Sequence, residues 1–149
     1  MKNILAAVDF SEVTYAVIDR AGLLARSLGC HLWLIHAAEP DPDFVGWEPG
    51  PPGVRDQVAR HLREEHRQLQ TLAAEQREAG VDTTALLVQG PTVATILGEA
   101  RKLDADLIVV GSHGRGAMYR VLLGSTSEGV LHKAHVPVLI VPSSARQTE

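Results

Sequence analysis

The chain has 149 residues, the size of one typical globular domain. Apolar residues make up 45% of it and charged residues 21%, proportions that exclude a disordered or collagen-like chain. Its formal net charge of −4 provides no overall positive field for a nucleic-acid backbone, so we expect no nucleic-acid partner, and any bound phosphate must be held locally.

The chain also lacks the sequence features of a membrane or disulfide-stabilised protein. All apolar runs are far shorter than the ~20 residues that a membrane-spanning helix needs, and Asp9 interrupts the first run before a signal peptide could form. We therefore expect a cytoplasmic protein without a membrane span. The single cysteine, Cys30, excludes an intrachain disulfide and a multi-thiolate metal site.

Short apolar runs and helical patterns alternate along the first half of the chain. Residues 4–8 form an apolar run that ends at an aspartate, which is typical of a strand buried on both faces. Apolar residues then recur at spacings of three and four as far as residue 28, which predicts a helix capped by Ser11 and ended by Gly29. The pattern continues with a second strand, a Pro- and Gly-rich loop, and a long helix with a solvated, charged face, over residues 31–38, 39–53 and 54–79.

The second half repeats the alternation. It predicts a strand over residues 83–88, followed by a helix that begins after Gly90-Pro91-Thr92. A strongly apolar strand at 107–110, a helix at 125–134 and a last strand at 136–141 complete the pattern. Pro137 and Pro142 favour an edge position for the last strand. The whole pattern indicates one α/β domain over residues 1–142, with a parallel sheet wrapped by helices, followed by a polar tail at 143–149.

The segment after the fourth predicted strand carries the clearest chemical signal, because ligands of open parallel sheets bind beyond the carboxyl ends of the strands. Gly111 and Gly114 let backbone amides approach an anion closely. Gly124 and Ser125 stand at the expected start of a helix, where free amides favour phosphate, and Arg115 adds local positive charge. These features suit a polyphosphate ligand; the alternative is that the glycines only make turns and that the serine only caps the helix.

The motif GSHGRG, the segment LLGSTSEGVL and the strand VPVLIVP resemble the nucleotide-binding signature of the universal stress protein family, G-x2-G-x9-G-S, and the resemblance covers most of the chain. It implies a three-layer, Rossmann-like domain of the adenine nucleotide alpha hydrolase type, with a five-stranded parallel sheet of order 3-2-1-4-5 and helices on both faces. It also implies a site for ATP, or for ADP or AMP. Carried over by position, the site residues are Ala7, Asp9, Ala37, Val110, Gly111, Gly114, Gly124, Ser125, Thr126 and Ser127.

The resemblance assigns roles to some of these residues. The glycines and Ser125 would hold the phosphates, and Ala37 would offer backbone groups to the adenine edge. Asp9 would accept hydrogen bonds from ribose hydroxyls or help to coordinate a magnesium ion bound to phosphate. From the residues alone, Asp9 is also compatible with a helix-start residue that has no ligand.

Together these observations predict a stress-response or regulatory module that binds an adenine nucleotide and signals its occupancy to an unknown protein partner. A Walker lysine, dinucleotide-binding glycines after the first strand and a Ser-His-Asp arrangement are all absent from the sequence pattern, so the alternative is a slow ATP hydrolase or an autophosphorylating phosphotransferase. Members of the family commonly pair through the last strand, and an apolar edge strand favours such pairing. We therefore expect a homodimer through residues 136–142, with a larger assembly left open.

Overall fold

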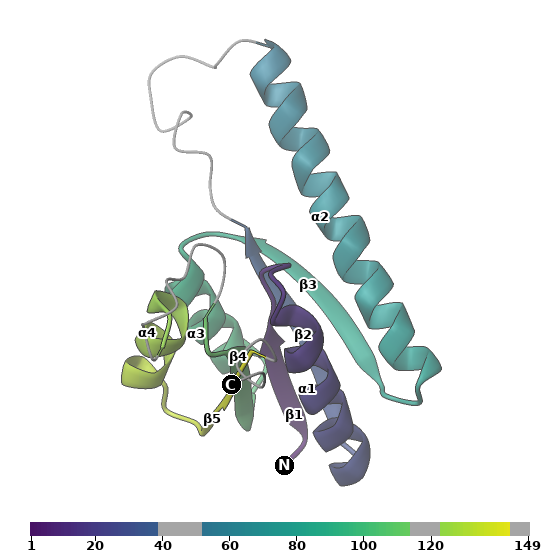
Figure 1. Cartoon of the computed structure of the whole chain (residues 1–149), viewed down its shortest axis with the longest axis vertical. Helices are drawn as coiled ribbons and strands as arrows, with labels where there is room; N and C mark the ends of the chain where they lie inside the picture. Colours follow the sequence, from purple (N-terminus) through teal and green to yellow (C-terminus); the bar gives the residue numbers. More distant parts are fainter. Residues whose placement is uncertain (39–51, 114–122, 144–149) are drawn as a thin grey trace.

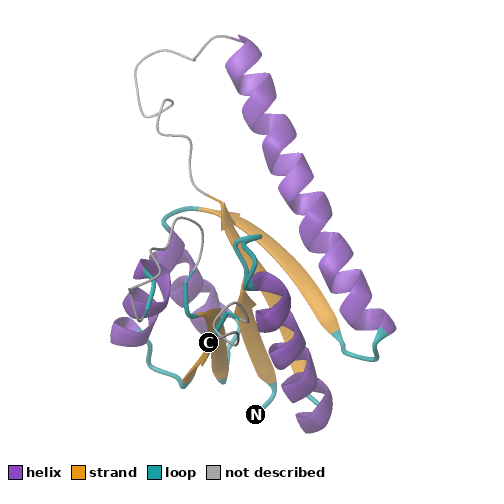
Figure 2. Ribbon diagram, viewed as in Figure 1, coloured by secondary structure: helices purple, strands orange, loops and turns teal. Residues whose placement is uncertain are grey.

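The computed structural model describes residues 1–38, 52–113 and 123–143. Its elements in chain order are β1 (Asn3–Ala7), α1 (Thr14–Leu28), β2 (His31–Ala38), α2 (Pro52–Glu78), β3 (Thr83–Gln89), α3 (Thr92–Lys102), β4 (Leu107–Gly111), α4 (Ser125–Lys133) and β5 (Val138–Val141). The strands form one parallel sheet of order β3-β2-β1-β4-β5. Helices α1 and α2 cover one face and α3 and α4 the other (Figures 1 and 2). The expected three-layer α/β fold and strand order are thus confirmed.

The central strands are apolar along their whole length because both of their faces are covered. Side chains alternate across a strand, so Ile4 of β1 packs under α1 and α2, whereas Leu5 packs under α3 and α4. In β4, Val109 and Ile108 divide in the same way between the two cores. Since Ile4 stands in register with both Leu32 of β2 and Leu107 of β4, the carboxyl ends of these strands lie at one edge of the sheet.

Helix α1 ends as expected but begins differently. Gly29 has a φ of 67°, a left-handed conformation that glycine adopts without steric cost, and its amide donates to the carbonyl of Ala25. The expected cap at Ser11 is wrong: the N-cap residue is Val13, without a side-chain cap, and the Ser11 hydroxyl donates instead to Asp9.

Helix α2 is long, and its solvent face is charged, as expected. The Arg67 guanidinium donates two hydrogen bonds to the Glu64 carboxylate, at 2.5 and 3.1 Å, and thereby lowers the pKa of Glu64. The opposite side of the helix packs on the sheet through Leu69, Leu72 and Ala73. The expected loop before this helix lies, for residues 39–51, outside the described residues.

Strand β5 lies at one edge of the sheet, as its prolines favour, and begins two residues later than expected, at Val138. The carbonyl of Pro137, just before it, accepts a hydrogen bond from the Ile108 amide at 3.0 Å. Ser143 is buried, although the sequence places it at the start of a polar tail, and residues 144–149 of that tail lie outside the described residues. In the described part of the chain, no helix combines the length and apolar character needed to cross a bilayer.

Candidate functional site

The order of the strands reverses between β1 and β4, and the loops that follow these two strands meet there. Gly111, at the end of β4, lies so close to Val13 of the β1–α1 loop that an added Cβ atom would be 2.5 Å from Val13 Cγ1. Gly111 does not have a positive φ. The structure therefore gives this glycine a packing role: it lets the two loops come together at the point where ligands of this architecture bind.

The carbonyl of Ser112 ties the end of β4 to the start of α4. It accepts hydrogen bonds from the Gly124 amide at 2.6 Å and from the Ser127 hydroxyl at 3.1 Å, while the Ser112 amide donates to Val141 of β5 at 2.8 Å. These bonds bring the predicted residues at positions 111, 124 and 127 together. They also engage the Gly124 amide, so the expectation that this amide is available to phosphate is not met.

The first turn of α4 supplies the remaining donors. Its N-cap residue, Gly124, has an extended conformation and provides no side-chain cap. The amides of Ser125 and Thr126, in the first turn, have no acceptor within the helix because no earlier helical carbonyl exists for them. The side chain of Ser125 is exposed and that of Thr126 is half-buried. Ser127 is buried and supports the start of the helix through its hydroxyl. The helix start thus presents backbone donors and the positive end of its dipole.

Asp9, just beyond β1, is oriented by the start of α1. Its Oδ1 atom accepts hydrogen bonds from the Ser11 amide at 3.0 Å and the Ser11 hydroxyl at 2.5 Å, and the Thr14 hydroxyl lies 3.5 Å away. These are the contacts of a residue that begins a helix. A carboxylate has several acceptor positions, so they orient the side chain without excluding a second partner such as a ribose or a cation.

The expected adenine side of the site is apolar. Ala7 and Ala37 are half-buried at the ends of β1 and β2, while the side chain of Val110 is buried in the core beneath α3 and α4. Val110 can therefore offer a ligand only its backbone groups. Gly114 and Arg115, two of the expected phosphate contacts, lie outside the described residues.

A buried histidine beside this site was not predictable from the sequence. The Nδ1 atom of His36, on β2, lies 2.8 Å from the carbonyl oxygen of Val8, and its Nε2 atom contacts a carboxylate oxygen of Glu65 on α2. The sequence signal for this residue is a histidine inside the apolar run HLWLIHAA. The pairing with Glu65 could not be predicted from a local pattern, because the two residues lie 29 positions apart in the chain.

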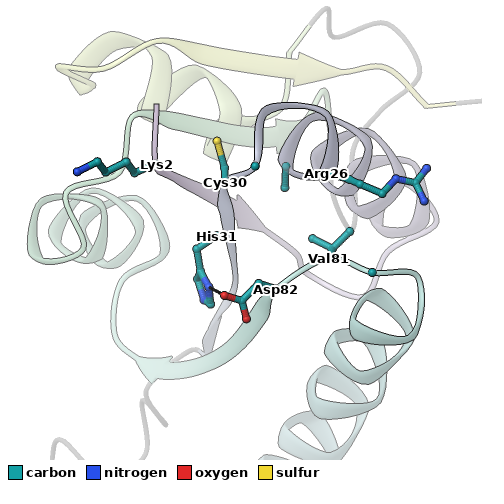
Figure 3. A pocket seen from close by; sticks show the side chains of 9 residues that line it. Lys2, Arg26, Cys30, His31, Val81 and Asp82 are labelled. Carbon is teal, nitrogen blue, oxygen red and sulfur yellow. Dashed lines mark ion pairs between the residues drawn. The ribbon is translucent and has the colours of Figure 1, made fainter.

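A separate hollow of about 380 Å³ lies at the opposite, amino-terminal edge of the sheet (Figure 3). Its lining includes His31 and Asp82, which form an ion pair at 3.0 Å. Its long basic side chains, Lys2 and Arg26, extend in opposite directions in Figure 3, and the Arg26 guanidinium donates to the carbonyl of Ala79. These cationic groups do not converge on one anion, so the carboxyl edge is the better candidate site.

Comparisons with known proteins agree with the fold. The model of the universal stress protein family matches residues 1–142. A Thermus aquaticus protein named "Universal stress protein in QAH/OAS sulfhydrylase 3'region" is 37% identical over 142 residues, which cover 94% of this chain and 98% of the relative. The solved structure of hypothetical protein MJ0577 has a TM-score of 0.80 at 25% identity and covers 95% of both chains. A universal stress protein solved in complex with cAMP has a TM-score of 0.68 at 26% identity, over 96% of this chain and 98% of that one.

Proposed function

The chain belongs to the universal stress protein family, and on that premise we propose that it is a regulatory module that binds an adenine nucleotide where β1 and β4 end. One observation carries the proposal: the start of α4, without a side-chain cap, is fixed beside the end of β4 by the Ser112 carbonyl. The amides of Ser125 and Thr126 would bind the phosphates, assisted by the helix dipole. Such a site needs no positive net charge on the protein as a whole.

The choice of ligand is supported by the apolar side of the site and by the comparisons. Ala7 and Ala37 are small, half-buried residues that would let a flat base lie beside the strand ends, and a relative of similar fold is described in complex with cAMP. We propose ATP, or ADP or AMP, as the ligand of this chain. Asp9 stands where it would accept a ribose hydroxyl or bind a magnesium ion carried by the phosphates.

We further propose that the protein is a homodimer through residues 136–142 and that nucleotide occupancy is signalled to a protein partner. Among the described residues, β5 pairs with β4 alone. The carbonyl of Pro137 bonds to Ile108 of β4, and the carbonyl of Val141 bonds to Ser112 just after it. By alternation, the backbone groups of Val138 and Ile140 are therefore directed toward the open edge. These groups can form a ladder with a second chain. The proposed setting is the cytoplasm, where adenine nucleotides are abundant.

Equilibrium dialysis against ATP, with two proline variants, tests the nucleotide proposal. Ser125→Pro removes one proposed phosphate donor at the first helical position, where proline is tolerated, and the extended Gly124 before it is compatible with proline. Thr92→Pro makes the same change at the start of α3, after Pro91, and is the matched control. We expect Ser125→Pro to weaken ATP binding about tenfold, because a charge-assisted hydrogen bond is lost, and Thr92→Pro to leave it unchanged.

Two results would argue against the proposal. If the unaltered chain retains no ATP, the proposal that it binds an adenine nucleotide is wrong. Equal affinities of the two variants would show that α4 does not bind the phosphates. Mass spectrometry of the protein as purified, after denaturation, identifies the nucleotide that it carries. ADP that accumulates with the unaltered chain but not with Gly124→Leu would favour a slow hydrolase instead.

A further inference from the structure

His36 and Glu65 form a largely buried pair between β2 and α2, beside the proposed nucleotide site. Their side chains are 10% and 14% exposed, whereas the neighbouring carboxylate, Glu64, is 48% exposed on the solvent side of α2. Glu65 lies between Leu62 and Leu69 on the side of the helix that faces the sheet. A buried charge is tolerated where it is paired and hydrogen-bonded, so the two side chains depend on each other.

The hydrogen bonds of His36 determine how many protons the pair holds. The Val8 carbonyl can only accept, so the Nδ1 atom that faces it at 2.8 Å carries a hydrogen. The Nε2 atom contacts a carboxylate oxygen of Glu65, and a second proton must lie between these two atoms. The pair is therefore either an imidazolium with a carboxylate or an imidazole with a carboxylic acid. In both forms, loss of one proton leaves a single imidazole hydrogen for two acceptors, the Val8 carbonyl and the Glu65 carboxylate.

Among the described residues, the groups around the pair include the titratable side chain of His61 of α2, which is largely exposed. Its Nε2 atom lies 3.0 Å from the second oxygen of Glu65. The β1 side contributes the Val8 carbonyl and the uncharged ring of Phe10, and β3 contributes the apolar Leu87 in register with His36. The carboxylate of Asp9, close by along the chain, is engaged by Ser11.

The same histidine supports the segment that carries Asp9. The Val8 amide donates to the carbonyl of Ile35 at 2.9 Å and the Val8 carbonyl accepts from His36, so both backbone groups of Val8 are held by β2. Phe10 has a φ of 60°, unusual for an aromatic residue, and its ring centroid lies 4.6 Å from that of His36. A backbone conformation of this kind persists only where the surrounding contacts hold it. His36 thus fixes the chain on both sides of Asp9.

We propose that His36 is a positioning residue, and that the proton it shares with Glu65 sets the affinity of the site for its adenine nucleotide. This inference rests on the proposed function. While the proton is present, α2 is anchored to β2 and the Val8–Asp9 peptide is held in place. When the proton leaves, the imidazole keeps one hydrogen, which cannot serve both the Val8 carbonyl and the Glu65 carboxylate. The anionic carboxylate is the stronger acceptor, so the hydrogen moves to Nε2, the Val8 carbonyl loses its donor, and Asp9 loses its orientation. Nucleotide binding is therefore tighter below the pH at which the pair loses this proton and weaker above it.

Three proteins test the proposal: the unaltered chain, Glu65→Gln, and Glu64→Gln as the matched control one residue away. In the Glu65→Gln variant, the new side-chain amide can donate to a neutral imidazole or accept from an imidazolium, so both contacts of His36 persist in either charge state. We expect the Kd for ATP, measured by calorimetry from about pH 5 to about pH 9, to rise about tenfold across one step in the unaltered chain and in Glu64→Gln. Glu65→Gln should lack that step.

Nuclear magnetic resonance of the ligand-free protein provides a second measurement. The Asp9 amide and the ring nitrogens of His36 should shift together with pH in the unaltered chain and in Glu64→Gln, at the pH of the affinity step. Protonation of ATP itself is common to all three proteins and cancels in the comparison.

The same affinity step in Glu65→Gln, or an affinity in the unaltered chain that does not follow the His36 resonances, would overturn the proposal. If Glu65→Gln does not fold, the second of these results still decides. If no protein retains ATP at any pH while the Asp9 amide step is present only where Glu65 is intact, the proposed nucleotide function fails and the support of Asp9 by His36 is upheld.

Discussion

Replacing Gly111 by alanine places a methyl group 2.5 Å from Cγ1 and 3.2 Å from Cγ2 of Val13. Carbon atoms in ordinary contact lie about 3.5–4.0 Å apart, so one of the two loops must move by about 1 Å. Val13 is buried and β-branched, and its side chain has little freedom to rotate away. Overpacking of this kind costs about 1–3 kcal/mol. Lower backbone entropy of the unfolded alanine chain offsets about 0.4–1 kcal/mol of that cost, so we expect a net loss of about 1–2 kcal/mol.

A double-mutant cycle separates the steric contact from other effects of the substitution. Val13→Ala alone removes two buried methyl groups and should cost about 2 kcal/mol, from lost burial and the cavity that remains. In the double variant, the alanine methyl at position 111 occupies part of this cavity, and the clash is absent. The double variant should therefore be about as stable as Val13→Ala, which gives a coupling energy of about 1–2 kcal/mol.

Urea denaturation followed by far-ultraviolet circular dichroism gives the four free energies of unfolding. Additivity of the two single substitutions within about 0.5 kcal/mol would refute the reasoning. Glycine would then be present at position 111 for some reason other than the approach of Val13.

Three further predictions concern other parts of the structure. The amides of Lys2 and Asn3 donate to the Asp106 carboxylate at 2.7 and 3.0 Å and lower its pKa, so its contribution to stability is present at neutral pH and is lost as the pH falls through that lowered pKa. The urea midpoint of Asp106→Asn should therefore approach that of the unaltered chain in acid. A constant difference between the two midpoints at all pH values would contradict this. Ser127→Ala removes the hydroxyl that donates to the carbonyls of Ser112 and Gly124. This variant should lower the free energy of unfolding by about 1 kcal/mol and weaken ATP binding. Unchanged stability and affinity would show that the hydroxyl does not support the site. Ile140→Pro removes an outward amide of β5, so sedimentation velocity should show a monomer. Ile140→Ala loses similar packing but keeps the amide, so it should stay a dimer. Equal sedimentation of the two variants would argue against pairing through this edge.

The strands and their arrangement were predictable because burial on two faces leaves a direct trace in the sequence. The continuous apolar runs of β1 and β4 required helices on both faces, and Gly29 marked the end of α1 because few other residues adopt its left-handed conformation. The prediction that Ser11 caps the helix was wrong because the rule for capping considers only the residue itself. In the structure, the Asp9 carboxylate accepts hydrogen bonds from both the amide and the hydroxyl of Ser11.

The location of the candidate site was predictable to the level of the sheet edge, and its contacts were not. A parallel topology brings Asp9, Gly111 and Ser125 to one edge whatever the detailed packing. The approach of Val13 to Gly111, the bond between Gly124 and Ser112 and the pairing of His36 with Glu65 each depend on residues far apart in the chain. No local pattern in the sequence encodes such distances.

The central claim, that the start of α4 binds the phosphates of an adenine nucleotide, is tested most directly by adding ATP to the 15N-labelled chain and following its amide resonances. The account predicts saturable shifts that are largest at Ser125 and Thr126, with a smaller shift at Asp9. Shifts centred on His31 and Asp82 at the opposite edge of the sheet, or no saturable shift at all, would contradict it.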